Sequence, residues 1–157
     1  TPAGEVCLLD FGIAKLLEPG PADGIETATG LRALSPAYAA PEQVLGEPVS
    51  AATDVYALGV LTYVLVTGAL PHARDAVSLE RLADLVRRET VVRPSLRLRE
   101  GRSGPGAVAA ADARRVVGDL DTIVLMALRA ERQRRYPSAA AYAADLRRWL
   151  DGRTVSA

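Results

Sequence analysis

The tripeptide Asp10-Phe11-Gly12 is the first part of the sequence whose residue types could do chemistry. It follows the short apolar run 5–9, which is typical of a buried strand. A carboxylate directly after such a strand can face a metal-bound polyphosphate, while the phenylalanine packs inward and the glycine lets the backbone turn sharply. Alone the tripeptide is a weak signal, because the same residues could form a turn that ends the strand.

Three later segments also place polar residues at defined positions. The run 35–42 (SPAYAAPE) could simply be a turn that leads into a helix. Asp54 stands at the head of an apolar helical run, where a carboxylate can act as a cap worth about 0.3–1 kcal/mol. The pair Arg134-Arg135 precedes the last predicted helix, and arginine pairs usually belong to solvated turns. Each segment has a simple structural explanation, but the order and spacing of the four together are specific.

The elements that must position these residues are mostly helices. The spacing of apolar residues predicts helices over 53–67, 79–88, 120–129 and 139–150, and one helical turn over 41–45 that begins with a proline. The helix over 53–67 is apolar almost all round, which predicts burial in a core. A strand is predicted over 5–9 and a second, shorter one over 13–17. The predicted fold class is α+β, mostly α-helical.

The predicted helix ends and loops follow from local residue types. Asp119 and Ser138 are expected to cap the helices that follow them, and Gly68 and Asp151-Gly152 to end the helices that precede them. The segment 18–33 is a long loop without hydrophobic period, of a length that is usually functional or disordered. The Arg/Gly/Pro-rich segment 89–115 is predicted to be a loop with weak structure.

Composition narrows the class of protein. The 157 residues include 19 Lys+Arg and 19 Asp+Glu, and this zero net charge argues against a nucleic-acid or membrane-surface protein. The longest apolar stretch, 55–66, is shorter than the ~20 residues that a membrane span needs. Cys7 is the only cysteine, so no internal disulfide is possible, and it is expected to be a buried inert thiol. The only histidine, His72, is expected in a surface turn.

In their order the motifs resemble those of the eukaryotic-like (Hanks-type) protein kinases, and the bacterial serine/threonine branch most closely. The resemblance runs from about residue 6 to residue 150; the family's Asp-Phe-Gly and Ala-Pro-Glu motifs match 10–12 and 40–42, and 118–124 is similar to the penultimate helix of this branch. It implies a partial kinase C-lobe without the N-lobe and catalytic loop. The expected domain is 1–152, with an activation segment at 10–42 and a helical subdomain at 43–152, and 153–157 would begin a linker or juxtamembrane segment.

The resemblance also implies roles in phosphoryl transfer. Asp10 would be catalytic by binding the Mg²⁺ that bridges the ATP phosphates, with Phe11 and Gly12 completing the cofactor site. Ser35 stands where the family usually has threonine, and its hydroxyl would contact the catalytic aspartate. Leu34 replaces a glycine that is frequent in the family. Residues 36–39 would receive the residue that follows the phosphorylated hydroxyl.

Structural and regulatory roles are implied for five further residues. Glu42 would pair with Arg135, and removing one partner would leave a buried charge at a cost of ~3–5 kcal/mol. Asp54 would hydrogen-bond backbone amides of the catalytic loop. Thr27 and Thr29 are candidate phosphorylation sites, because added charge could order their loop against arginines, although they could also be polar loop residues.

The sequence lacks a glycine-rich phosphate loop and a His-Arg-Asp motif, and Lys15 follows Asp10, so it is not the ATP-anchoring lysine. We therefore expect the chain by itself to be inactive, and its parent to be a serine/threonine kinase that uses ATP and Mg²⁺. The alternative is a pseudokinase-like or truncated protein-interaction module. The expected partners are protein substrates and the N-lobe of the parent, with no nucleic acid and no membrane span. The expected location is cytoplasmic, and a membrane anchor of the parent beyond residue 157 stays open.

Overall fold

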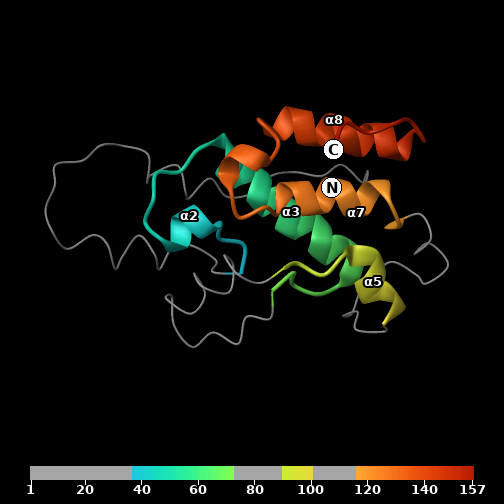
Figure 1. Ribbon diagram of the computed structural model, residues 1–157, viewed down its shortest axis with the longest axis horizontal. Coiled ribbons are helices and arrows are strands. Elements are labelled where there is room, and N and C mark those ends of the chain that lie inside the picture. Colours follow the sequence, from blue (N-terminus) through green and yellow to red (C-terminus); the bar gives the residue numbers. More distant parts are fainter. Residues whose placement is uncertain (1–36, 73–89, 101–115) are drawn as a thin grey trace, which may run out of the picture. The chain divides into compact units, whose positions relative to one another are not determined.

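The computed structural model describes residues 37–72, 90–100 and 116–157, all of which belong to the compact unit 36–157. In order, the elements are α2 (Pro41–Val44), α3 (Ala51–Thr67), α5 (Pro94–Arg99), α7 (Asp119–Ala127), the 3₁₀ turn η2 (Arg132–Arg134) and α8 (Ala139–Leu150) (Figure 1). The described part of the chain is thus helical, without a strand. The predictions for Cys7, the strands at 5–9 and 13–17, the loop at 18–33 and the helix at 79–88 lie outside the described residues.

Helix α3 confirms the strongest helix prediction and begins two residues earlier than expected, at Ala51. Ser50 takes the N-cap position in an extended conformation, and its backbone N–H donates to Thr53 Oγ1 at 3.0 Å. The helix ends at Gly68, as predicted, because this glycine adopts a left-handed conformation with φ of 67°. The termination is therefore encoded locally, whereas the start depends on a cap that lies outside the apolar run.

The core of the unit is built around α3, which contacts α5, α7, η2 and α8. Two apolar clusters lie on its sides: Tyr56, Val60 and Tyr63 pack with α7 in the first, and Val55 packs with α7 and α8 in the second. All four of these α3 side chains are fully buried, which confirms a core helix. Its remaining face is open, since Leu61 and Leu65 are 44% and 64% exposed.

A close approach of two backbones depends on Gly59. A Cβ atom at this position would lie 2.8 Å from Ala127 Cβ and 3.2 Å from Leu128 Cδ2, so α3 and α7 can approach this closely only because residue 59 has no side chain. We expect Gly59→Val to lower the free energy of unfolding by about 2 kcal/mol through overpacking, as measured by urea denaturation. Ala127→Gly in the same chain should recover part of that loss. An equal loss from Gly59→Val with and without Ala127→Gly would contradict the close approach.

Helix α8 has the predicted bounds, and Ser138 caps it, because Ser138 Oγ accepts a hydrogen bond from Ala141 N at 3.1 Å. Tyr142 is buried, and its hydroxyl donates to Thr62 Oγ1 of α3 at 2.7 Å. Trp149 is half-buried and packs against both apolar clusters. Apolar burial and one inter-helix hydrogen bond thus fix α8 on α3.

A buried carboxylate that was not predicted ties the end of the chain to α8. Asp145 is 1% exposed and accepts hydrogen bonds from Tyr136 Oη at 3.0 Å, from Arg148 Nη1 at 2.6 Å and from Ser156 N at 3.0 Å. Burial alone would raise the pKa of Asp145, but these bonds outweigh it and lower the pKa below its usual value of 3.8. Since Val155 also packs against the second cluster, the packed part of the chain continues beyond Gly152.

The loop prediction for 89–115 is wrong over the six residues of α5. Pro94 occupies the first helical turn, and the next residue is tied to α7: Ser95 N donates to Asp121 Oδ1 at 2.9 Å and Ser95 Oγ to Asp121 Oδ2 at 2.5 Å. Because this partner lies 26 residues away, local composition could not reveal the helix.

Two smaller predictions are also wrong. The N-cap of α7 is Gly118, with φ of 96°, and the Gly118 carbonyl accepts the hydrogen bond from Thr122 N, which places Asp119 inside the helix. His72 is only 1% exposed and is therefore not a surface residue. Its turn lies against α5, where Arg97 Nη2 donates to the Leu70 carbonyl at 3.2 Å.

No helix in the described ranges is both long and apolar enough to cross a membrane.

Candidate functional site

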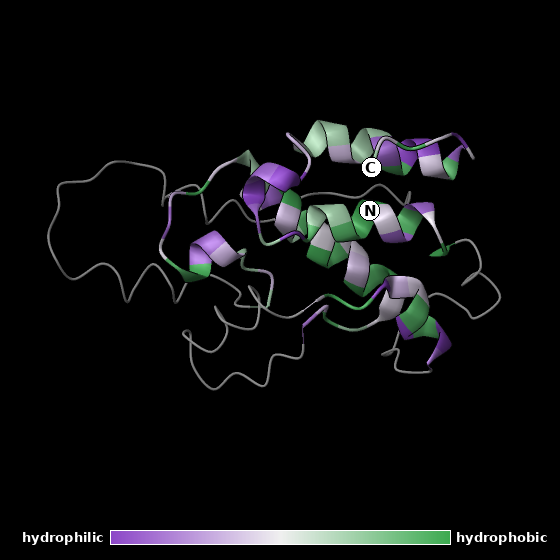
Figure 2. Ribbon diagram, viewed as in Figure 1, coloured by the Kyte–Doolittle hydropathy of each residue, from purple (hydrophilic) through white to green (hydrophobic). Residues whose placement is uncertain are grey.

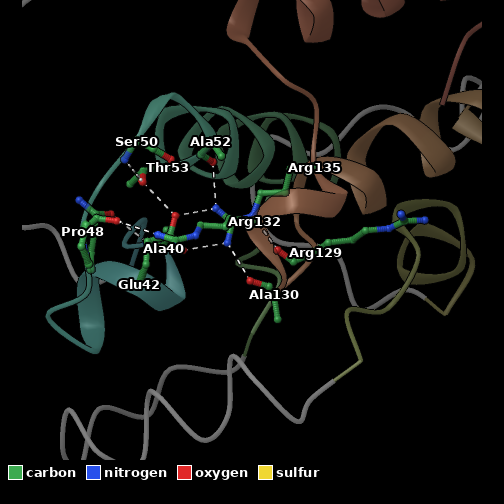
Figure 3. Close-up of polar contacts among 11 residues, drawn as sticks. Ala40, Glu42, Pro48, Ser50, Ala52, Thr53, Arg129, Ala130, Arg132 and Arg135 are labelled. Carbon is green, nitrogen blue, oxygen red and sulfur yellow. Dashed lines mark hydrogen bonds and ion pairs between the residues drawn. The ribbon is translucent and has the colours of Figure 1, made fainter.

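A buried ion pair joins the start of the helical unit to a turn that lies 93 residues later in the sequence. Glu42, in the single turn α2, is 3% exposed, and Arg135, which follows η2, is 4% exposed. Arg135 Nη1 donates to Glu42 Oε1 at 2.7 Å, and Nη2 donates to Oε2 at 2.8 Å. The guanidinium and carboxylate therefore face each other in the bidentate arrangement, which is the strongest form of this contact (Figure 3).

The guanidinium of Arg135 is also held by three backbone carbonyls. Its Nε donates to Arg129 O at 2.7 Å, Nη1 to Ala52 O at 2.9 Å and Nη2 to Ala130 O at 3.0 Å (Figure 3). The Cζ atom of the guanidinium lies over the Tyr56 ring, 5.0 Å from the ring centroid, a distance that permits a cation–π contact. One side chain thus binds α2, the first turn of α3 and the segment between α7 and η2.

Thr53 is a further residue of the site, and it was not identified as one from the sequence. Its hydroxyl donates to Glu42 Oε1 at 2.9 Å and is itself the acceptor for Ser50 N. At the base of α2, Gln43 Oε1 accepts from Ala40 N at 2.9 Å. The only sequence signal for Thr53 is its place in the first turn of a buried helix, one residue before Asp54, and this does not identify a partner in another helix.

The hydrogen bonds decide the charge state of Glu42. Burial alone would raise the pKa of this carboxyl group. The bonds from Arg135 and Thr53, its own backbone N–H and the charge of Arg135 outweigh burial and lower the pKa below its usual value of 4.5. Glu42 is therefore ionised at neutral pH, and the contact is a true ion pair.

This shift predicts a defined pH dependence of stability. A carboxyl group whose pKa is lower in the folded chain stabilises it fully above the unfolded pKa, here 4.5, and loses that contribution as the pH falls through the folded value. We expect the free energy of unfolding to fall below pH 4.5, and to fall less steeply in Glu42→Gln, because that variant has no proton to bind at this position. Urea denaturation between pH 3 and pH 7 measures both slopes. Equal slopes would show that Glu42 is not held ionised.

The other predicted site residues are not brought to this ion pair by the described structure. Asp54 lies exposed in the first turn of α3. Asp10, Phe11, Gly12, Thr27, Thr29 and Ser35 lie outside the described residues. Within 37–72, 90–100 and 116–157, no group of three or more His, Cys, Asp or Glu side chains is arranged to hold a metal ion. What the structure describes is an attachment point: the pair of Glu42 and Arg135 can hold α2 rigidly against the helices that follow it.

Comparison with known proteins gives matches over most of the chain. Residues 2–103 match the protein kinase domain family. The serine/threonine-protein kinase PknA of Mycobacterium tuberculosis is 36% identical over 133 residues, which cover 73% of this chain and 30% of PknA. The serine/threonine-protein kinase PknB of Mycolicibacterium smegmatis is 34% identical over 155 residues, which cover 97% of this chain and 21% of PknB. The serine/threonine-protein kinase Pkn1 of Myxococcus xanthus is 43% identical over 82 residues, covering 52% of this chain and 11% of Pkn1. The matched region spans less than a third of each relative.

Proposed function

This chain belongs to the protein kinase family, and from that premise we propose that it is part of an active serine/threonine kinase that transfers the γ-phosphoryl group of ATP to protein substrates. The observation that carries the proposal is the bidentate, buried pair of Glu42 and Arg135. Glu42 is the last residue of the segment matching Ala-Pro-Glu, and the pair attaches this end of the proposed activation segment to the helical base. Relatives that are named serine/threonine-protein kinases support the same substrate class.

The proposed roles divide between positioning and charge. Phosphoryl transfer depends mainly on positioning and on electrostatic stabilisation, so a rigid attachment at Glu42 has a direct catalytic use: it fixes the surface that receives the substrate. Asp54, at the head of α3, would orient the catalytic loop, and Ser35 would contact the catalytic aspartate. Phosphorylation of Thr27 or Thr29 would order the activation segment. These residues position groups and do not themselves transfer the phosphoryl group.

The proposed cofactors are ATP and Mg²⁺, and Asp10 would hold the metal. A carboxylate oxygen is the ligand type that Mg²⁺ prefers, so the chemistry of this residue fits the ion. When bound, Mg²⁺ neutralises charge that develops on the phosphates. The further parts that phosphoryl transfer needs, a catalytic base and an ATP-anchoring lysine, would come from residues of the kinase that precede Thr1.

The test uses the longer protein that contains this chain, incubated with radiolabelled ATP, Mg²⁺ and casein. We expect phosphate incorporation into serine or threonine, and background incorporation for Asp10→Asn. The matched control is Asp151→Asn, since Asp151 is an exposed aspartate at the end of α8, and it should keep full activity. Equal incorporation by Asp10→Asn and the unchanged protein would exclude the proposed metal role. A longer protein that binds a partner protein but transfers no phosphate would instead be the pseudokinase-like interaction module.

A further inference from the structure

A cavity of about 610 Å³ lies between α5 and α7, and nothing in the proposed kinase function uses it. We call it the α5–α7 groove; its lining includes three arginines and several apolar side chains, among them Arg93, Arg99, Arg129, Leu96, Val117 and Met126. Figure 1 shows the two helices that form its walls, and Figure 2 shows that α5 carries both hydrophilic and hydrophobic residues. The groove therefore has a mixed character that differs from the apolar core.

The charge of the α5–α7 groove is positive. Arg93, Arg99 and Arg129 are all exposed, and no carboxylate in the described ranges forms an ion pair with them. Arg129 accepts a hydrogen bond from Arg135 through its carbonyl (Figure 3), and its own Nη1 donates to the Arg134 carbonyl at 3.3 Å, so Arg93 and Arg99 are the two arginines on which the proposal rests. The one acidic residue in the lining, Asp121, is 4% exposed, and both its oxygens already accept hydrogen bonds from Ser95. An acidic ligand would thus meet cationic side chains in the lining, where Asp121 is the only carboxylate.

Part of the lining of the groove is apolar and reaches solvent. Leu96 and Val117 are 45% and 44% exposed, and Met126 is half-buried beside them. Exposed apolar surface with a polar rim is typical of a surface that binds another protein. A nucleic acid is a poor fit, because it would require a broad basic face, and this chain has no net positive charge.

We propose that the α5–α7 groove binds an acidic peptide segment of another protein. One apolar side chain of that segment would lie on Leu96 and Val117, and carboxylates on either side of it would pair with the surrounding arginines. Arginine suits this role, because its planar guanidinium binds a carboxylate through two parallel hydrogen bonds. The apolar part of the lining distinguishes such a peptide from free anions, which would gain nothing from contact with Leu96.

The test measures the fluorescence anisotropy of a labelled dodecapeptide, built of aspartate and glutamate around one central leucine, titrated with the 157-residue chain. Two control peptides replace the leucine by serine, or all the acidic residues by lysine. We expect the acidic leucine peptide to bind, the serine peptide to bind at least about fivefold more weakly, and the lysine peptide not to bind. No ATP is present, so the result is independent of the proposed kinase activity. Equal affinity for all three peptides, or no binding of any, would overturn the proposal.

Matched variants locate the binding. Arg93→Glu with Arg99→Glu should weaken binding of the acidic leucine peptide at least tenfold, whereas Arg147→Glu with Arg153→Glu, which changes exposed residues of α8 and the C-terminal segment by the same charge, should change it less than twofold. Equal losses in both pairs would show bulk attraction and overturn the groove as the site. If the first pair fails to fold, as judged by circular dichroism, Leu96→Ser decides. It should remove the preference for the leucine peptide over the serine peptide, and a preserved preference would contradict the proposal.

Discussion

Replacing Arg135 by methionine is expected to lower the free energy of unfolding by about 3–5 kcal/mol, because it leaves the ionised Glu42 buried without its cation. The carboxylate keeps only Thr53 as a side-chain donor at 2.9 Å, and three backbone carbonyls lose their guanidinium partner. Methionine replaces the aliphatic stem of arginine but not its guanidinium group, so the loss reports the missing charge and hydrogen bonds together with the space that this group filled. Urea denaturation at pH 7 measures it, and in the proposed longer kinase we expect activity to fall together with stability.

Two further variants distinguish the effect of breaking the ion pair from the effect of removing any positive charge. Arg134→Met removes the neighbouring, exposed arginine and should change the free energy of unfolding by less than about 0.5 kcal/mol. The double variant Glu42→Met, Arg135→Met removes both charges, and replacing a buried pair by apolar residues is often neutral or even stabilising. The double variant should therefore be more stable than Arg135→Met alone. If the two single losses simply add, Glu42 and Arg135 do not act as a pair.

The parts of the fold that the sequence predicts well are those set by neighbours along the chain. The bounds of α8 and its Ser138 cap follow from apolar spacing and from one polar residue three positions before its donor. The end of α3 follows from Gly68, whose left-handed conformation costs a glycine little. Such features depend on φ and ψ preferences and on hydrogen bonds between residues that are close in sequence, so they can be read without a three-dimensional structure.

The residues that the sequence could not place are buried polar groups with distant partners. Thr53, Asp145 and Asp121 carry no sign of a buried polar contact in their own residue type, because polar side chains are usually exposed. In the structure they bind Glu42, Ser156 and Ser95, at separations of 11, 11 and 26 residues. A buried polar group needs a specific partner to offset its desolvation, and nothing in local composition says which residue that will be.

The ion pair of Glu42 and Arg135 could be predicted in part, unlike the buried polar contacts of Thr53, Asp145 and Asp121. Local pattern favoured a solvated turn for Arg135, and only the kinase resemblance suggested a pairing with Glu42 across 93 residues. The resemblance identified Arg135 as the partner of Glu42, because the order of the motifs is specific. It did not identify the residues that surround the pair. The contacts to Thr53 and to the carbonyl of Ala52 came only from the structure. The same limit explains the missed helix α5, whose anchor on α7 belongs to no motif.

The contact between Asp121 of α7 and Ser95 of α5 leads to the second large expected effect. Asp121→Ala should lower the free energy of unfolding by about 2–4 kcal/mol. Both carboxylate oxygens of Asp121 are in use, one by the backbone N–H of Ser95 and one by its hydroxyl, and both residues are buried. Removing the carboxylate leaves two donors unsatisfied, each at a cost of about 1–3 kcal/mol, reduced where water can enter. Because this contact fixes α5 on α7, we also expect the hydrogen-exchange protection of α5 to fall more than that of α8.

Asp119→Ala is the matched control for this prediction, since Asp119 lies in the same first turn of α7 and interacts with the same helix dipole, but is exposed. Its effect should stay below about 1 kcal/mol. Asp121→Asn should lie between the two, because the amide can still accept from Ser95 N and donate to Ser95 Oγ, although the bonds lose the strength that the charge gives them. An Asn variant as unstable as the Ala variant would mean that the charge itself, and not the pair of hydrogen bonds, holds α5 in place. Equal losses from Asp119→Ala and Asp121→Ala would show that Asp121 contributes only through the helix dipole and not through its bonds to Ser95.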